Sequence, residues 1–80
     1  MYIGIRSLTY AQKGERALSW EGVLADIVRL PAGLSGGGCA YALRLQSQQL
    51  PKALMILKRA GIETGKRFVR SDSGWQEVQS

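Results

Sequence analysis

The chain has 80 residues, which is room for one domain, and 45% of them are hydrophobic while 21% are charged. This is an ordinary globular composition, and it excludes a disordered or collagen-like chain. The net charge is +5, and a single cysteine without any histidine excludes an internal disulfide framework, histidine-containing zinc sites and histidine-dependent catalytic units within one chain.

No secretory signal is expected at the start of the chain. Residues 1–6 lack the basic start and the apolar stretch of roughly 7–15 residues that such a signal needs. Apolar runs such as residues 53–57 are far shorter than the ~20 residues that span a bilayer. We therefore expect a soluble, cytoplasmic protein with no membrane partner, in which the lone thiol of Cys39 stays reduced.

The first half of the chain predicts a strand, a helix and a second strand. Residues 2–6 have the alternation of a short strand, and the capping-box spacing that begins at Thr9 predicts a helix from about that residue. The helix is expected to end at Gly22, a left-handed C-cap whose neighbour Val23 supplies the accompanying apolar contact. The mainly apolar residues 24–30 are expected to form the second strand.

The second half predicts the same elements again. Residues 40–46 follow a glycine-rich loop and alternate cleanly between apolar and other side chains, which is typical of a half-buried strand. A helix with apolar residues at helical spacing is expected from Leu50, ending at Gly61 and Ile62 in the manner of the first helix. The tail is expected to form a strand, a turn at residues 71–74 and a short returning strand.

This order of elements predicts a ferredoxin-like α+β fold. A β-α-β-β-α-β chain with right-handed crossovers places its first and third strands at the centre of an antiparallel sheet, with both helices on one face. We expect one such domain over residues 1–80, with a hairpin at its C-terminus. Asp26 is expected to pair with Arg44 across the second and third strands, and Trp20 and Trp75 are expected to be partial core or oligomer contacts.

The loop before Cys39 is the segment that could carry chemistry. Residues 31–39 contain Gly33, Gly36, Gly37 and Gly38, and successive glycine amides can point into one anion-binding concavity. A thiolate or persulfide on Cys39 would be stabilised there, with Arg29 and Arg44 on the flanking strands adding positive potential. The alternative is a plain hairpin in which Cys39 is a small buried side chain.

The helix dipoles are expected to oppose this activation. We expect the third strand to start at the sheet end away from both helix N-termini, where the helix C-terminal ends disfavour an anion. Activation of Cys39 would then come from the loop amides and the arginines.

A resemblance to a known family starts from this same loop. The shared residues are those of the loop and of the strand after it: Pro31, Leu34, Ser35, Gly38, Cys39, Tyr41, Leu43 and Arg44. With the stretch from Ile5 to Lys13, they make the chain resemble small bacterial proteins of the selenium/sulfur carrier-like family over residues 2–69. The family usually has glycine after the cysteine, where this chain has Ala40.

The resemblance implies a carrier, and not an enzyme in the strict sense, that holds sulfur or selenium on Cys39 as a persulfide or selenylsulfide. Its partners would be a protein donor, such as a desulfurase persulfide, and a protein acceptor. We expect neither a metal nor an organic cofactor. The binding groups would be the Ser35 hydroxyl, the amides of Gly36, Gly37 and Gly38, and the guanidinium of Arg29 or Arg44.

Two other functions remain open from the sequence. The chain could be a dimeric protein-interaction module or a small-ligand regulatory module in which Cys39 is passive. RNA binding on the sheet is less favoured, because the third strand offers Tyr41 with two leucines and the basic residues are spread along the chain.

Overall fold

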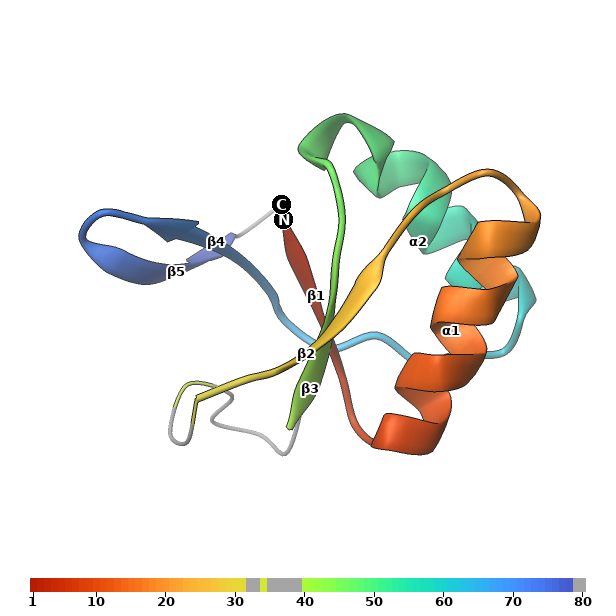
Figure 1. Ribbon diagram of the computed structural model, residues 1–80, viewed down its shortest axis with the longest axis horizontal. Coiled ribbons are helices and arrows are strands. Elements are labelled where there is room, and N and C mark those ends of the chain that lie inside the picture. Colours follow the sequence, from red (N-terminus) through yellow and green to blue (C-terminus); the bar gives the residue numbers. More distant parts are fainter. Residues whose placement is uncertain (32–33, 35–39, 79–80) are drawn as a thin grey trace.

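The helices and strands follow the predicted order in a computed structural model that describes residues 1–31, 34 and 40–78. The elements are shown in Figure 1. They are β1 (Tyr2–Ile5), α1 (Leu8–Trp20), β2 (Asp26–Arg29), β3 (Tyr41–Arg44), the short 3-10 helix η1 (Ser47–Gln49), α2 (Leu50–Arg59), β4 (Arg67–Ser71) and β5 (Gly74–Val78).

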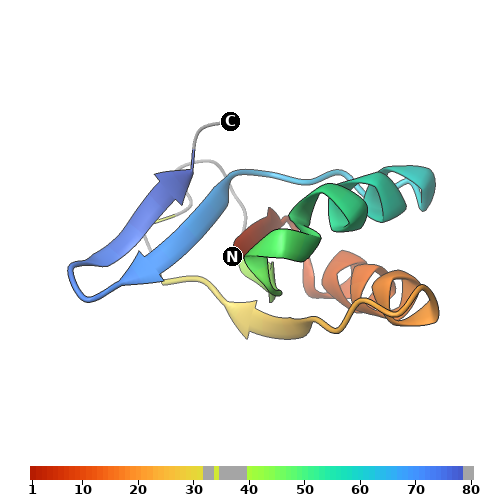
Figure 2. The same ribbon diagram turned by 90° about the horizontal axis from the view of Figure 1, so that it is seen from above.

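The five strands form one antiparallel sheet in the order β2-β3-β1-β4-β5. The first and third strands are central neighbours, with Ile3 opposite Leu43 and Ile5 opposite Tyr41. Both helices lie on one side of the sheet, and the β4–β5 hairpin extends away from them (Figure 2). The fold is therefore a ferredoxin-like α+β sandwich, which confirms the prediction.

The first helix starts at Leu8, close to the predicted start at about Thr9, but its N-cap is not Thr9. The N-cap is Ser7, whose extended backbone precedes the helix and whose Oγ accepts a hydrogen bond from the Tyr10 amide at 3.3 Å. Thr9 instead lies within the first turn of α1. A capping box is recognised by Glu or Gln at the third helical position, and the Ser7 cap has Tyr10 there. Gln12 supplied that signal for Thr9, so the sequence pointed to the wrong cap.

Both helices end on the same glycine motif, as predicted. Gly22 and Gly61 adopt φ values of +80° and +75°, in the left-handed region that glycine enters without a steric penalty. The amide after each glycine, in Val23 and Ile62, donates to a carbonyl five residues back, in Leu18 and Leu57. Each motif satisfies helix-end carbonyls and turns the chain back toward the sheet.

The main core lies between the helices and the sheet. Its fully buried members come from both layers and are Ile3, Ile5, Ala11, Leu18, Val23, Leu43, Ala53 and Leu57. The helix α1 approaches the sheet closely at Gly14, where a Cβ atom would lie 3.0 Å from the side chains of Leu43 and Leu57. Only a residue without a side chain fits there without movement of its neighbours.

A second, smaller cluster covers the helix-free face of the sheet. Leu30, Ala42 and Phe68 are buried in it, and four half-buried side chains pack against them: Tyr2, Val28, Leu34 and Trp75. The Trp75 ring meets the Tyr2 ring edge-on at 4.6 Å between centroids, so the prediction of a partial core contact is confirmed for Trp75. Trp20 is 85% exposed and belongs to no core cluster among the described residues.

Candidate functional site

The strands β2 and β3 hold the two ends of the candidate loop. Their register pairs Arg29 with Tyr41, and the Leu30 amide donates to the Ala40 carbonyl at 2.9 Å, one step beyond the paired strands. The predicted loop residues Ser35, Gly36, Gly37, Gly38 and Cys39 lie outside the described residues. Ala40 directly follows Cys39 in the sequence. The hydrogen bond between Leu30 and Ala40 therefore joins described residues from the two sides of this segment.

Two residues of the loop are described, Pro31 and Leu34, and Leu34 packs on the helix-free face of the sheet. The Leu34 amide donates to the Pro31 carbonyl at 3.2 Å, and its half-buried side chain contacts the cluster of Leu30, Ala42 and Phe68. The sequence analysis assigned Leu34 only to the family motif. The structure adds a physical role, because burial of this side chain tethers the loop to the sheet.

The expectation about the helix dipoles was wrong for one of the two helices. Ile5 and Arg29 both lie beside Tyr41, so β1 and β2 end where β3 starts. The helix α1 begins at Leu8, only three residues after Ile5, and its N-terminus therefore lies at the same end of the sheet as the loop. The reason is that β1 and β2 run in the same direction, while α1 runs back between them. The helix α2 starts at Leu50, after the far end of β3, so its N-terminus does lie away from the loop as expected.

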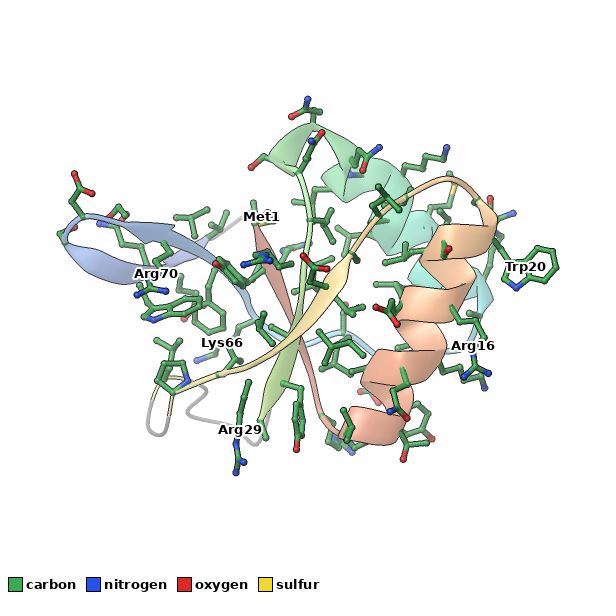
Figure 3. The ribbon with its side chains drawn as sticks, in the orientation of Figure 1. Met1, Arg16, Trp20, Arg29, Lys66 and Arg70 are labelled. Atoms are coloured by element: carbon green, nitrogen blue, oxygen red, sulfur yellow. The ribbon has the colours of Figure 1, made fainter. Side chains whose placement is uncertain are left out.

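The two candidate arginines occupy different ends of the sheet. Arg29 is exposed at the end of β2 next to the loop, and Figure 3 shows its side chain pointing away from the sheet. Arg44 lies at the far end of β3, opposite Asp26, and its guanidinium forms the predicted ion pair with that carboxylate at 2.7 Å. Hydrogen bonds to Asp26 and then to Tyr2 raise the pKa of Arg44. Arg29, and not Arg44, is thus the cation beside the loop.

Another cation at this end was not singled out from the sequence. Arg6 is exposed in the short connection between β1 and α1, directly before the N-cap Ser7. Its position at the end of the strand predicted over residues 2–6 was the signal available. Arg6 and Arg29 together with the α1 N-terminus give this end of the sheet a positive character.

Three aromatic side chains gather on the helix-free face of the sheet, which the sequence analysis did not consider. Tyr41 lies on the helix side, where it packs against the main core. Tyr2, Phe68 and Trp75 come from β1, β4 and β5 and meet on the other face, with Arg70 positioned 5.6 Å over the Trp75 ring. The helix-free face therefore carries both aromatic and cationic groups.

Comparison with known proteins identifies one family. The family described as "Putative Se/S carrier protein-like" matches residues 1–68 of the 80-residue chain. The match runs from β1 to Phe68, and so includes the candidate loop and excludes most of the C-terminal hairpin. No match was found among curated proteins or among solved structures. No helix in the described part of the chain combines the length and the apolar character needed to cross a membrane.

Proposed function

The chain belongs to the Se/S carrier protein-like family, and on this premise we propose that it carries a sulfur or selenium atom on Cys39. The family match is the observation that carries the proposal. It covers Cys39, which is the only cysteine of the chain, so a persulfide or selenylsulfide has one place to form. The chain has no histidine to act as a general base, and a thiol that gains its reactivity by ionisation needs none.

The transfer step is a thiol–disulfide type of exchange. The Cys39 thiolate attacks the terminal sulfur of a donor persulfide, a new S–S bond forms on Cys39, and the donor's S–S bond breaks. The donor leaves as a thiolate, and the proton of its terminal sulfur moves with that sulfur to the carrier. A donor with selenium in the terminal position would give a selenylsulfide by the same step. No external oxidant or reductant is required.

The proposed binding groups contribute partial and full positive charge that stabilises the sulfur species on Cys39. We assign the amides of Gly36, Gly37 and Gly38 and the hydroxyl of Ser35 as donors to the sulfur species. Support for the electrostatic part comes from described residues. Arg29 lies at the loop end of β2, and the N-terminus of α1 lies at the same end of the sheet. Arg44 acts from the opposite end of β3 with its charge shared by Asp26, so its contribution is smaller.

The partners of such a carrier are other proteins. A persulfide donor and an acceptor enzyme must each bring a reactive sulfur to Cys39, and the cationic end of the sheet favours partners with acidic surfaces around their own reactive groups. Arg6 and Arg29 are exposed there and available for such contacts. We propose that donor and acceptor use this end in turn.

Intact-mass measurement after incubation with a persulfide donor tests the proposal. The wild-type chain is expected to gain the mass of one sulfur atom and to lose it on addition of a reductant. The Cys39→Ser variant is expected to gain nothing, while Met55→Leu, a substitution at an exposed position on α2, should load normally. An unmodified wild-type chain, or equal loading of the Cys39→Ser variant, would refute the carrier role.

One observation favours the second function considered from the sequence, a dimeric interaction module. Trp20 and Leu24 are 85% and 81% exposed on either side of the Gly22 turn, where water contact of two large apolar side chains is costly. Sedimentation of the wild type against a Trp20→Ser, Leu24→Ser double variant tests it. A concentration-dependent dimer that the double variant loses supports the module, and a wild-type monomer at all concentrations contradicts it.

A further inference from the structure

A second candidate site lies at the end of the sheet opposite the loop. An open cleft of about 670 Å³ separates η1 from the β4–β5 hairpin. It is lined by Tyr2 at the start of β1, by Arg44 at the end of β3 and by Leu45, which follows β3. Figure 1 shows η1 and the hairpin on either side of these strands. None of the residues proposed above to bind sulfur lines this cleft except Arg44.

Two guanidinium groups enter the cleft from different strands. Arg44 comes from β3 and Arg70 from β4, and both line it. Each is held by a neighbour, since Arg44 pairs with Asp26 at 2.7 Å and Arg70 lies 5.6 Å over the Trp75 ring. Figure 3 shows Arg70 on the hairpin side of the sheet. Two oriented guanidinium groups with several N–H donors each are suited to bind a phosphate.

The facing wall supplies neutral hydrogen-bond donors. Gln46, Ser47 and Gln49 line the cleft at the start of η1, and Gln46, the N-cap residue, makes no side-chain cap hydrogen bond. These amide and hydroxyl groups can donate to anionic or sugar oxygens. Asp26 is the carboxylate among the described lining residues, and its charge is engaged by Arg44.

The cleft also has apolar lining residues. Tyr2, Leu24 and Val69 line it, and Leu24 is 81% exposed. The Tyr2 ring is fixed by its edge contact with Trp75, and a ring held in this way can stack on a base with little loss of freedom. A ligand that joins a phosphate to an aromatic ring would match both halves of the cleft.

We propose that this cleft binds a nucleotide, with its phosphate between Arg44 and Arg70 and its base against Tyr2 and Leu24. The nucleotide is either a free mononucleotide or one unit of a single strand, because both present the same chemistry. The site does not depend on Cys39 or on the proposed sulfur carriage.

Fluorescence titration of Trp75 tests the proposal directly. In the full chain with Trp20→Phe, Trp75 is the remaining tryptophan and contacts both Tyr2 and Arg70 at the cleft. The probes are adenosine monophosphate, inorganic phosphate and a short single-stranded uridine oligonucleotide. We expect saturable binding of the mononucleotide at least tenfold tighter than that of phosphate. Tighter binding of the oligonucleotide, with a steeper salt dependence, would identify a single strand as the source.

Charge variants separate a binding role from a structural one. Arg70→Gln and Arg44→Gln are each expected to weaken nucleotide binding about tenfold, whereas Arg16→Gln, on the helix side of the molecule, should leave it unchanged. Asp26→Asn removes the negative charge from the cleft and is expected to tighten binding several-fold, a gain that unfolding cannot produce. Cys39→Ser should bind as the wild type does. Binding that none of the cleft variants alters, or binding of phosphate as tight as that of the nucleotide, overturns the proposal.

Discussion

Asp26 and Arg44 face each other across β2 and β3 and form a 2.7 Å ion pair at the end of the hairpin away from the candidate loop. The pair marks the register of the two strands at that end. At the other end, the hydrogen bond from the Leu30 amide to the Ala40 carbonyl joins the two strands next to the candidate loop. The ion pair also holds Arg44 at the end of β3 away from Ala40, the residue that follows Cys39 in the sequence. Of the two predicted arginines, Arg29 is the one beside the loop.

This difference in position predicts different effects of the two arginines on the Cys39 thiol. Arg29→Gln removes a positive charge near the thiolate, so the thiol pKa should rise and alkylation near neutral pH should slow. An exposed charge that acts through a water-like medium is expected to change the thiol pKa by less than about 1 unit. Arg44→Gln serves as the matched control and should shift the alkylation profile less. Alkylation rates measured against pH check this, and a larger shift for Arg44→Gln would contradict it.

The N-cap of α1 can be identified by two alanine substitutions. Ser7→Ala removes the side-chain oxygen that accepts from Tyr10 and should cost about 1 kcal/mol of unfolding free energy. Thr9→Ala lies within the helix and should be neutral or slightly stabilising, because alanine is the better helix former. Urea denaturation of both variants measures the difference. Equal losses would show that Ser7 does not cap the helix.

The two helix-ending glycines should respond to substitution through the backbone alone. A Cβ atom at Gly22 or Gly61 would meet nothing within 4 Å, so no clash contributes. Alanine must nevertheless adopt a positive φ, which costs about 1 kcal/mol at each position. Asparagine enters this region more easily and should recover part of the loss. Thermal unfolding of the alanine and asparagine variants gives the comparison, and an asparagine variant no more stable than alanine would argue against backbone strain.

The two tryptophans should differ strongly in their contribution to stability. Trp75 packs on Tyr2 and Phe68, and Trp75→Ala should lose roughly 2 kcal/mol, less than a fully buried tryptophan would. Trp20 is 85% exposed, so Trp20→Ala should change the stability by no more than about 0.5 kcal/mol. Urea midpoints report both losses. Acrylamide should quench Trp20 more than Trp75 in the single-tryptophan variants, and the reverse order would contradict the packing.

Local sequence signals were sufficient for most of the fold. The alternation around Leu43 placed β3 correctly with its apolar side toward the helices, and the glycines at 22 and 61 ended both helices where they were expected. These signals act over a few residues, so a single sequence contains them. The N-cap of α1 was missed because two hydroxyl residues, Ser7 and Thr9, lie close together and only Thr9 has the capping-box partner.

Some features that depend on distant residues were predicted, such as the Asp26–Arg44 pair, and others were not. Tyr2, Phe68 and Trp75 come from three strands and become neighbours only when the sheet forms, so no local pattern indicates an aromatic cluster on the helix-free face. The direction of α1 relative to the loop follows from the predicted β-α-β-β-α-β order, and the expectation about the helix dipoles misread that order. Of the predicted site residues, Arg29 and Arg44 have described positions at opposite ends of the β2–β3 pair. The roles of Cys39, Ser35 and Gly36–Gly38 stay predictions.

The repeated strand-helix-strand pattern places the start of one helix at each end of the sheet. The first helix starts at the end of the sheet where the loop joins β2 to β3. The second helix starts at the opposite end, where η1 and Arg44 line the cleft. Each end of the sheet thus combines a helix start with an arginine from a different strand. An anion bound at one end of the sheet therefore need not obstruct the binding of a second anion at the other end.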